Sequence, residues 1–174
     1  FYHLLRRQMK TEFRKPLIVF TPKSLLRDPR VVSSVDEFAT GTFQETIDDV
    51  TANKKEVKTL VFCTGKFYYD LDAERQNLGR KDVAIVRIEQ LFPLPVEQLK
   101  AIIKSYPKAD DFVWAQEEPQ NMGAYSFMLM NFDLVKWRLA SLKAYAAPAA
   151  GSYTRAKRRH ADAIRMVFDK NLFQ

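Results

Sequence analysis

Four short apolar runs, separated by helix-length segments, constrain the fold of this chain most strongly. They occupy residues 17–20, 60–62, 83–86 and 112–114. None of them alternates between apolar and polar residues, and uninterrupted runs of this length are typical of strands that are buried on both faces. We therefore expect an α/β domain, a three-layer sandwich in which helices cover both faces of a central, mostly parallel sheet.

The intervals between these runs carry helix signals. Ser34 and Glu37 have the spacing of a capping box that opens a short helix. Gly79 is expected to end a helix over residues 67–78, and Pro95 suits the first turn of another. Strands and helices should therefore alternate, as crossover connections in a parallel sheet require.

The two ends of the chain also suggest helices. Part of 124–142, which is rich in large apolar side chains, is predicted to form a buried helix, and a final helix is expected over 153–171. Residues 1–14 read as a helix that Pro16 separates from the first apolar run. We therefore place a domain boundary after residue 14, with 15–174 as the main domain.

Composition excludes several classes of protein. The single Cys63 rules out an internal disulfide, and His3 and His160 do not form a zinc-binding pattern with it, so we predict no metal site. No apolar stretch approaches the roughly 20 residues that span a bilayer, and the first residues have no signal-peptide pattern. We expect a cytosolic or organelle-matrix setting.

The net charge of +7 is concentrated at the two ends of the chain. Residues 1–15 carry five Lys or Arg and one acid, and residues 153–174 carry six against two acids. Arg155, Lys157, Arg158 and Arg159 would suit phosphate contacts to a nucleic acid. The alternative, which we favour, is a solvated helix face, because no nucleic-acid-binding motif accompanies the charges.

Polar side chains follow the apolar runs, and the carboxyl ends of parallel strands are where ligands gather. Several of these side chains are cations that could converge on one anion, such as a nucleotide or the pyrophosphate of coenzyme A. The alternative is that they pair with Glu89, Glu117 and Glu118. The candidate residues for a regulatory anion or nucleotide site are Thr21, Lys23, Arg27, Lys66, Tyr69, Arg87 and Gln116.

Glu117 and Glu118 are adjacent, so their side chains diverge and they suit paired acid–base catalysis poorly. We expect Gln116 and one glutamate to hydrogen-bond across a subunit contact or onto loop amides, with Asn121 near the start of the next helix. No hydroxyl or thiol has a recognisable base nearby, and Cys63 reads as a buried small hydrophobe. The residues by themselves assign no catalytic group.

Five stretches of the chain resemble one known family in the order in which they occur. They are residues 1–8, 14–27, 65–71, 82–95 and 116–124. The family is the C-terminal part of the thiamine-dependent, decarboxylating component of 2-oxoglutarate dehydrogenase. The resemblance implies a fold like the transketolase C-terminal domain, and residues 1–14 would be the end of a preceding pyrimidine-binding domain.

The resemblance also implies a function for the parent enzyme. That enzyme would decarboxylate 2-oxoglutarate on thiamine diphosphate with magnesium and pass the succinyl group to a lipoyl-bearing succinyltransferase in the citric acid cycle. Upstream domains would hold the cofactor, so this fragment alone should be inactive and bind none. Its role would be to brace a homodimer, with Glu117, Glu118 and Asn121 as subunit contacts, and to bind acetyl-CoA or an adenine nucleotide as effector.

Three alternatives stay open at the level of sequence. The chain could be a freestanding nucleotide- or coenzyme A-binding module, or the equivalent domain of a pyruvate dehydrogenase or transketolase-type enzyme. It could also bind nucleic acid through the basic segment Arg155 to Arg159.

Overall fold

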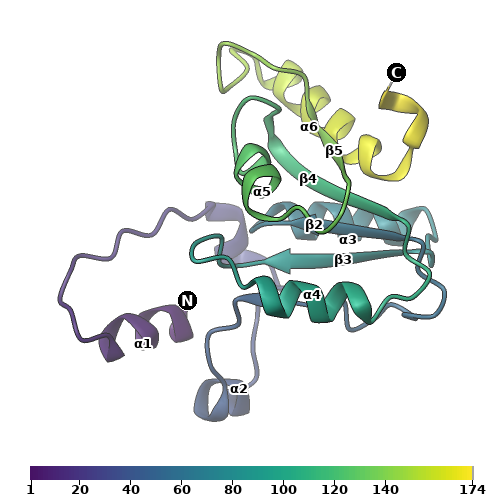
Figure 1. Ribbon diagram of the computed structural model, residues 1–174. Helices are drawn as coiled ribbons and strands as arrows, with labels where there is room; N and C mark the ends of the chain where they lie inside the picture. The colour runs from purple at the N-terminus through teal and green to yellow at the C-terminus, as the bar shows by residue number, and fades with distance from the viewer. Residues whose placement is uncertain (174) are drawn as a thin grey trace. The chain divides into compact units, whose positions relative to one another are not determined.

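The computed structural model describes residues 1–173, which form two compact units, Phe1–Gln44 and a second that begins at Glu45. Figure 1 shows that the strands of the sheet belong to the second unit. The boundary that we expected after residue 14 stays a prediction.

The first unit contains three short helical segments. They are α1 (Tyr2–Lys10), the 3-10 helix η1 (Lys23–Arg27) and α2 (Val35–Thr40). The predicted capping box is confirmed: Ser34 Oγ accepts a hydrogen bond from the Glu37 amide at 3.2 Å, and the Glu37 carboxylate accepts one from the Ser34 amide at 2.7 Å.

The strand predicted at residues 17–20 is wrong. This segment pairs with no other strand in the part of the chain that the structure describes, and its side chains face solvent, with Phe20 95% and Ile18 76% exposed. β-Propensity reports how well a residue fits a pleated, half-buried surface, and these residues have no such surface here.

The second unit is built on a five-stranded sheet with the order β1-β3-β2-β4-β5. Only β1 runs antiparallel to its neighbour, so the predicted mostly parallel sheet is confirmed. The strands are β1 (Thr46–Ile47), β2 (Thr59–Cys63), β3 (Val83–Ile88), β4 (Asp111–Pro119) and β5 (Trp137–Leu142).

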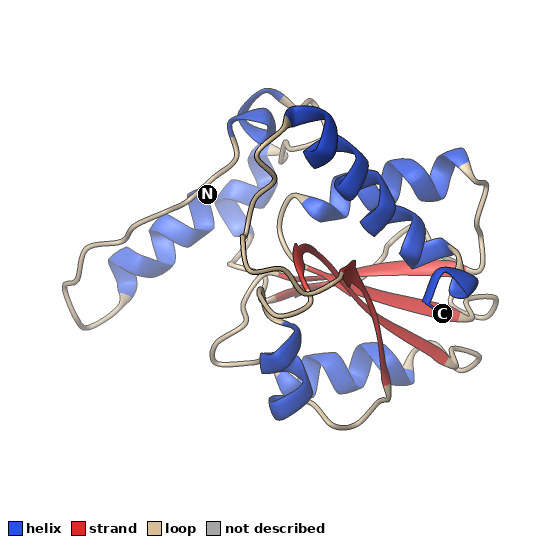
Figure 2. Cartoon of the chain, turned by 90° about the horizontal axis from the view of Figure 1, so that it is seen from above, coloured by secondary structure: helices blue, strands red, loops and turns tan. Residues whose placement is uncertain are grey.

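Helices cover both faces of the sheet, which confirms the three-layer architecture (Figure 2). On one face lie α3 (Phe67–Asn77) and α6 (Tyr153–Phe168), and on the other lie α4 (Val96–Lys104) and α5 (Tyr125–Asn131).

Successive residues of each central strand supply the two cores because side chains alternate across a strand. Val61 packs on the face of α3 and α6, with Leu71 and Val167, whereas Phe62 packs on the opposite face with Leu99. All five side chains are buried. Unbroken apolar runs were therefore the correct signal for these strands.

The last third of the chain agrees with the prediction only in part: α5 (Tyr125–Asn131) is the helix expected within 124–142, with Met128 buried. Of residues 124–142, only α5 is helical, and β5 forms an edge strand that we did not anticipate. The helix α6 ends at Phe168, before the expected residue 171, and the 3-10 helix η2 (Lys170–Phe173) follows. Gly79, by contrast, follows α3 as predicted, with a left-handed φ of 61° that L-residues with a side chain adopt at a cost.

Candidate functional site

The carboxyl ends of β2, β3 and β4 meet at one edge of the sheet. Cys63 at the end of β2 is in register with Arg87, and Phe62 is in register with Trp114, two residues before Gln116. Lys66 follows β2 directly in the first turn leading into α3. The structure therefore brings four of the predicted anion-site residues to a common edge: Lys66, Arg87, Gln116 and Tyr69, whose hydroxyl accepts from Arg87 at 3.4 Å.

Four charged side chains, Lys66, Asp70, Glu117 and His160, form a compact group at this edge, which we call the edge cluster. The Lys66 ammonium contacts the Asp70 carboxylate and lies 3.3 Å from Glu117 Oε1. His160 bridges the same two acids, with Nε2 3.3 Å from Asp70 Oδ2 and Nδ1 3.2 Å from Glu117 Oε1. The cluster joins three elements, α3, β4 and α6.

The electrostatics of the edge cluster favour full ionisation. Hydrogen bonds to Asp70 and Glu117 raise the pKa of His160 to about 9, so the imidazole is protonated at neutral pH. Burial disfavours the charged forms of Asp70 and Glu117, but His160 and Lys66 outweigh it and hold the pKa of both carboxyl groups below the ordinary range. Two positive and two negative charges therefore balance.

The edge cluster is only partly predictable from the sequence. Pairing of Lys66 with Glu117 was one of the alternatives for the cations at the strand ends, whereas Asp70 and His160 were not assigned to the site. The Lys66 to Asp70 spacing of four residues on a helix was a usable signal for an ion pair. His160 gave no such signal, because its partners lie far away in the sequence.

A metal ion is a poor fit to the edge cluster. One ligand atom each from Asp70, Glu117 and His160 lie within 4.8 Å of one another, which is a spacing that metals use. The Lys66 ammonium already contacts both carboxylates, and a cation would have to displace it and deprotonate His160. The cluster is better described as an ion network that fastens α6 to the sheet.

Arg87 is the cation at this edge that retains binding capacity. Its guanidinium stacks over Tyr68 at 4.5 Å from the ring centroid and donates to the Tyr69 hydroxyl at 3.4 Å. Its Nε is buried and has no hydrogen-bond partner within residues 1–173, and the Glu89 carboxylate lies 3.9 Å away. A buried donor without a partner costs free energy, which an anion bound here would recover.

The hydrogen-bonding groups of the Gln116 side chain all have partners inside the domain. Its Nε2 donates to the carbonyls of Pro119 at 3.1 Å and Met122 at 2.8 Å, and its Oε1 accepts from Trp114 Nε1 at 2.8 Å and from the Tyr125 amide at 3.1 Å. Gln116 therefore shapes the turn between β4 and α5. This agrees with the expectation that its side chain hydrogen-bonds to groups of the loop.

Gly123 completes this turn, with a φ of 69°. A Cβ at Gly123 would lie 2.9 Å from Gln116 Oε1, so the close approach requires glycine. Asn121 pairs with the backbone of Tyr145 in both directions, at 3.0 and 3.1 Å. Of the three predicted subunit-contact residues, Glu118 and Asn121 are exposed and Glu117 is half-buried, and the contact role of all three stays a prediction.

The remaining predicted anion-site residues lie in the first unit. Thr21 is exposed in the extended segment before η1, and η1 carries Lys23 and Arg27. Convergence of these residues with Lys66, Tyr69 and Arg87 stays a prediction.

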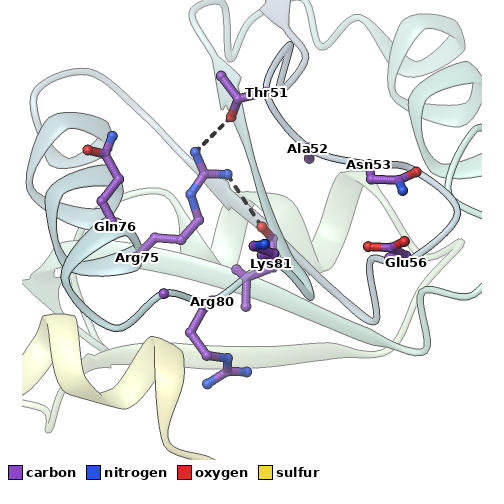
Figure 3. Close-up of a pocket in the computed structure, with 10 residues that line it drawn as sticks. Thr51, Ala52, Asn53, Glu56, Arg75, Gln76, Arg80 and Lys81 are labelled. Carbon is purple, nitrogen blue, oxygen red and sulfur yellow. Dashed lines mark hydrogen bonds between the residues drawn. The ribbon is translucent and has the colours of Figure 1, made fainter.

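The opposite edge of the sheet carries a pocket of about 310 Å³ near the amino end of β3 (Figure 3). Arg75 reaches into it from α3 and donates to Thr51 Oγ1 at 3.0 Å. The same guanidinium contacts Asp49 and Asp72, and Asp49 also accepts from the Ile85 amide at 3.0 Å. Arg75 is therefore saturated by two carboxylates and serves the structure.

None of the helices among residues 1–173 combines the length and the apolar character needed to cross a membrane.

The fold and the site define an α/β domain whose polar residues at the sheet edge are bound mainly to one another. Residues 32–168 match the family described as 2-oxoglutarate dehydrogenase C-terminal. The chain therefore belongs to this family, and the family resemblance predicted from its motifs is confirmed.

Full-length relatives place this domain in larger proteins. The chain is 50% identical over 157 residues to the 2-oxoadipate dehydrogenase complex component E1 of Xenopus laevis, covering 87% of the chain and 17% of that protein. It is 47% identical over 156 residues to the 2-oxoglutarate dehydrogenase E1 component of Haemophilus influenzae, covering 86% of the chain and 17% of that protein. The chain thus spans less than a fifth of these relatives.

A solved structure of a split-gene transketolase, described as an inactive beta4 tetramer, aligns with a TM-score of 0.49 and 15% identity. The alignment covers 73% of this chain and 43% of that one.

Proposed function

We propose that this chain is the C-terminal domain of the E1 component of a 2-oxo acid dehydrogenase complex, and that it supports catalysis carried out elsewhere in the same protein. The family match over residues 32–168 carries the proposal. The site is consistent with it, because the edge cluster is charge-balanced and Gln116 is fully hydrogen-bonded. A supporting role needs rigid packing rather than free catalytic groups.

For the parent protein we propose oxidative decarboxylation of 2-oxoglutarate and transfer of the succinyl group to a lipoyl-bearing acyltransferase, in the citric acid cycle of a bacterial cytoplasm or mitochondrial matrix. The rival substrate is 2-oxoadipate, for which several relatives are named. The full-length parent should be assayed with 2-oxoglutarate, 2-oxoadipate and pyruvate. A kcat/KM for pyruvate above that for both dicarboxylates would overturn the assignment.

Thiamine diphosphate would supply the decarboxylation chemistry in the parent, but the described residues do not fit it. A diphosphate with magnesium needs free carboxylate ligands. In the one group of three metal-ligating side chains in residues 1–173, Lys66 and the protonated His160 neutralise the two carboxylates. We propose that upstream domains hold the cofactor and that the 174 residues alone are inactive. Turnover of 2-oxoglutarate by this fragment, supplied with cofactor and magnesium, would refute this.

The first unit supports a bracing role. The exposed apolar segment at residues 17–20 has the composition of a buried strand but no partner within the described residues. We propose that it completes a sheet of the upstream domain in the intact homodimer, which would move the domain boundary from residue 14 towards residue 32, where the family match begins. Phe20→Asp in the full-length parent should then weaken its thermal stability, while Val50→Asp, at a residue that is 94% exposed, should not.

A second proposed role is binding of an anionic effector at Arg87, of the acetyl-CoA or adenine nucleotide type. The Nε of Arg87 favours it, because this atom is buried and makes no hydrogen bond within residues 1–173, with only the Glu89 carboxylate 3.9 Å away. Calorimetry on the full-length parent with acetyl-CoA and with AMP should detect binding that Arg87→Gln weakens at least tenfold. Equal binding by both proteins would remove Arg87 from the effector site.

A further inference from the structure

The helix α6 lies at the periphery of its unit (Figure 1), and its first two turns are exposed. Residues 153–158 are all exposed, including Ala156 on the side of the helix that lower down packs on the sheet. Burial begins at Arg159 and His160 and is complete only at Ala163. The edge cluster thus fastens the middle of α6, and the turns of the helix on its amino-terminal side are exposed.

This exposed end is strongly basic. Arg155, Lys157 and Arg158 form no ion pair or hydrogen bond within the described part of the chain, and the first acid of the helix is Asp162. We call Tyr153, Arg155, Lys157 and Arg158 the basic end of α6. Tyr153 is 83% exposed among these cations.

The sequence at this end destabilises the isolated helix. The amino end of a helix carries a partial positive charge, so cations there are unfavourable. Arg155 and Arg158 are three residues apart and repel each other. Ser152 occupies the N-cap position, yet its side chain makes no capping hydrogen bond. No acidic side chain in the described part of the domain pairs with these cations to offset the unfavourable charge, whereas a negatively charged partner would offset it.

We propose that the basic end of α6 docks into an acidic surface of another protein of the complex, the lipoyl-bearing acyltransferase. Charge complementarity determines the sign of the partner surface. At 100° per residue, Lys157 lies on a different side of the helix from Arg155 and Arg158, so the acidic surface must be concave and enclose the helix end. Exposed Tyr and Arg side chains are typical energetic centres of protein interfaces. No nucleic-acid-binding motif accompanies the charges, which favours a protein over a nucleic acid. The identity of the partner rests on the proposed function.

The test uses the full-length parent and the purified acyltransferase, with two triple variants that remove the same charge. The control cations are exposed and without ion pairs in the described residues; one ends α4 and the other two lie in the loops before β4 and β5. The test variant is Arg155→Gln, Lys157→Gln, Arg158→Gln, and the control variant is Lys104→Gln, Lys108→Gln, Lys136→Gln.

We expect the test variant to bind the acyltransferase at least tenfold more weakly at 50 mM salt, with a smaller loss at 200 mM salt, because screening weakens the wild-type contact. The control variant should bind like wild type. Both variants should retain decarboxylation measured with an artificial electron acceptor. The melting temperature of the test variant should be equal or higher, since unfavourable charges are removed; this distinguishes lost docking from misfolding.

Three other outcomes would overturn the docking proposal. Equal binding by the two triple variants would show that the basic end is not the contact, and unchanged affinity of Tyr153→Ala would exclude an enclosing protein surface. A stronger salt-dependent affinity for duplex DNA or for anionic phosphatidylserine vesicles, lost in the test variant, would assign the cations to those polyanions. A parent that decarboxylates no 2-oxo acid would instead refute the proposed function, which the electron-acceptor assay reveals independently.

Discussion

Replacing His160 by glutamine should remove a pH-dependent part of the stability of the second unit. Glutamine retains the size and one donor of the side chain but cannot carry charge. His160 bridges Asp70 and Glu117, which raise its pKa from 6.5 to about 9. At about 1.4 kcal/mol per pKa unit this gives a gross value of about 3 kcal/mol. Because the side chain is 33% exposed, screening reduces it to about 1–2 kcal/mol.

The sign of the pH dependence follows from the direction of the shift. Since the pKa in the folded state lies above the ordinary value of 6.5, the stabilisation is complete below pH 6.5, falls as the pH rises and is lost above about 9. Lys66 stays charged over this window, because Asp70 and Glu117 outweigh burial and raise its pKa above the ordinary value. Wild type and His160→Gln should therefore differ most at pH 6.5 and converge near pH 9.5.

Urea unfolding followed by circular dichroism at pH 6.5, 8 and 9.5 measures this difference. Lys157→Gln is the matched control, since it removes one positive charge from an exposed position on the same helix. Its effect should be a few tenths of a kcal/mol and constant across the series. A loss in His160→Gln that is equal at all three pH values would refute the reasoning, because it would show that His160 contributes by packing and not by charge.

Three further changes test other parts of the structure. Arg75→Met should lower the free energy of unfolding, measured by urea titration, by about 3–5 kcal/mol, because it leaves the buried Asp49 carboxylate unpaired. Its control, Lys81→Met in the exposed rim of the same pocket, should leave the free energy of unfolding nearly unchanged. Gly123→Ala should cost about 1–3 kcal/mol, from the left-handed φ and the contact with Gln116, and Gly151→Ala, with open space around it, should cost far less by the same measurement. Deleting residues 1–44 should leave the second unit folded, with a single cooperative calorimetric transition; a noncooperative transition would contradict the separation into two units.

The central part of the fold could be predicted because local signals there agree with the tertiary structure. The apolar runs at 60–62, 83–86 and 112–114 are buried strands, and Gly79 follows α3 as expected. In these segments the residues that favour a strand are also those that the two cores bury.

The errors have the opposite cause, since local pattern and tertiary context disagree. Trp137 to Leu142 follows a long stretch of large apolar residues and mixes Arg and Ser with Ala and Leu, so its pattern does not distinguish a helix from a strand. It becomes β5 because β4 offers a parallel partner, with Trp114 opposite Leu139. Residues 17–20 carry a clear strand pattern and pair with no strand in the described part of the chain, so the same rule fails in the other direction.

The edge cluster shows a further limit of sequence reasoning. Its four members are spread over residues 66–160, and each taken alone reads as an ordinary surface charge or a helix residue. Only the sheet order, with β4 beside β2 and α6 on the same face as α3, brings His160 to two carboxylates.

Two neighbouring parts of α6 have opposite electrostatic surroundings. At His160 the positive charge is shared between two acids and stabilises the domain, whereas about a turn earlier Arg155 and Lys157 pair with no acid among the described residues. An α-helix is stiff over two turns and rises 1.5 Å per residue. The ion pairs that hold His160 in place therefore also fix the position of the basic end. If the docking proposal holds, raising the pH above 9 should therefore weaken acyltransferase binding by loosening the helix, even though the docking arginines remain charged.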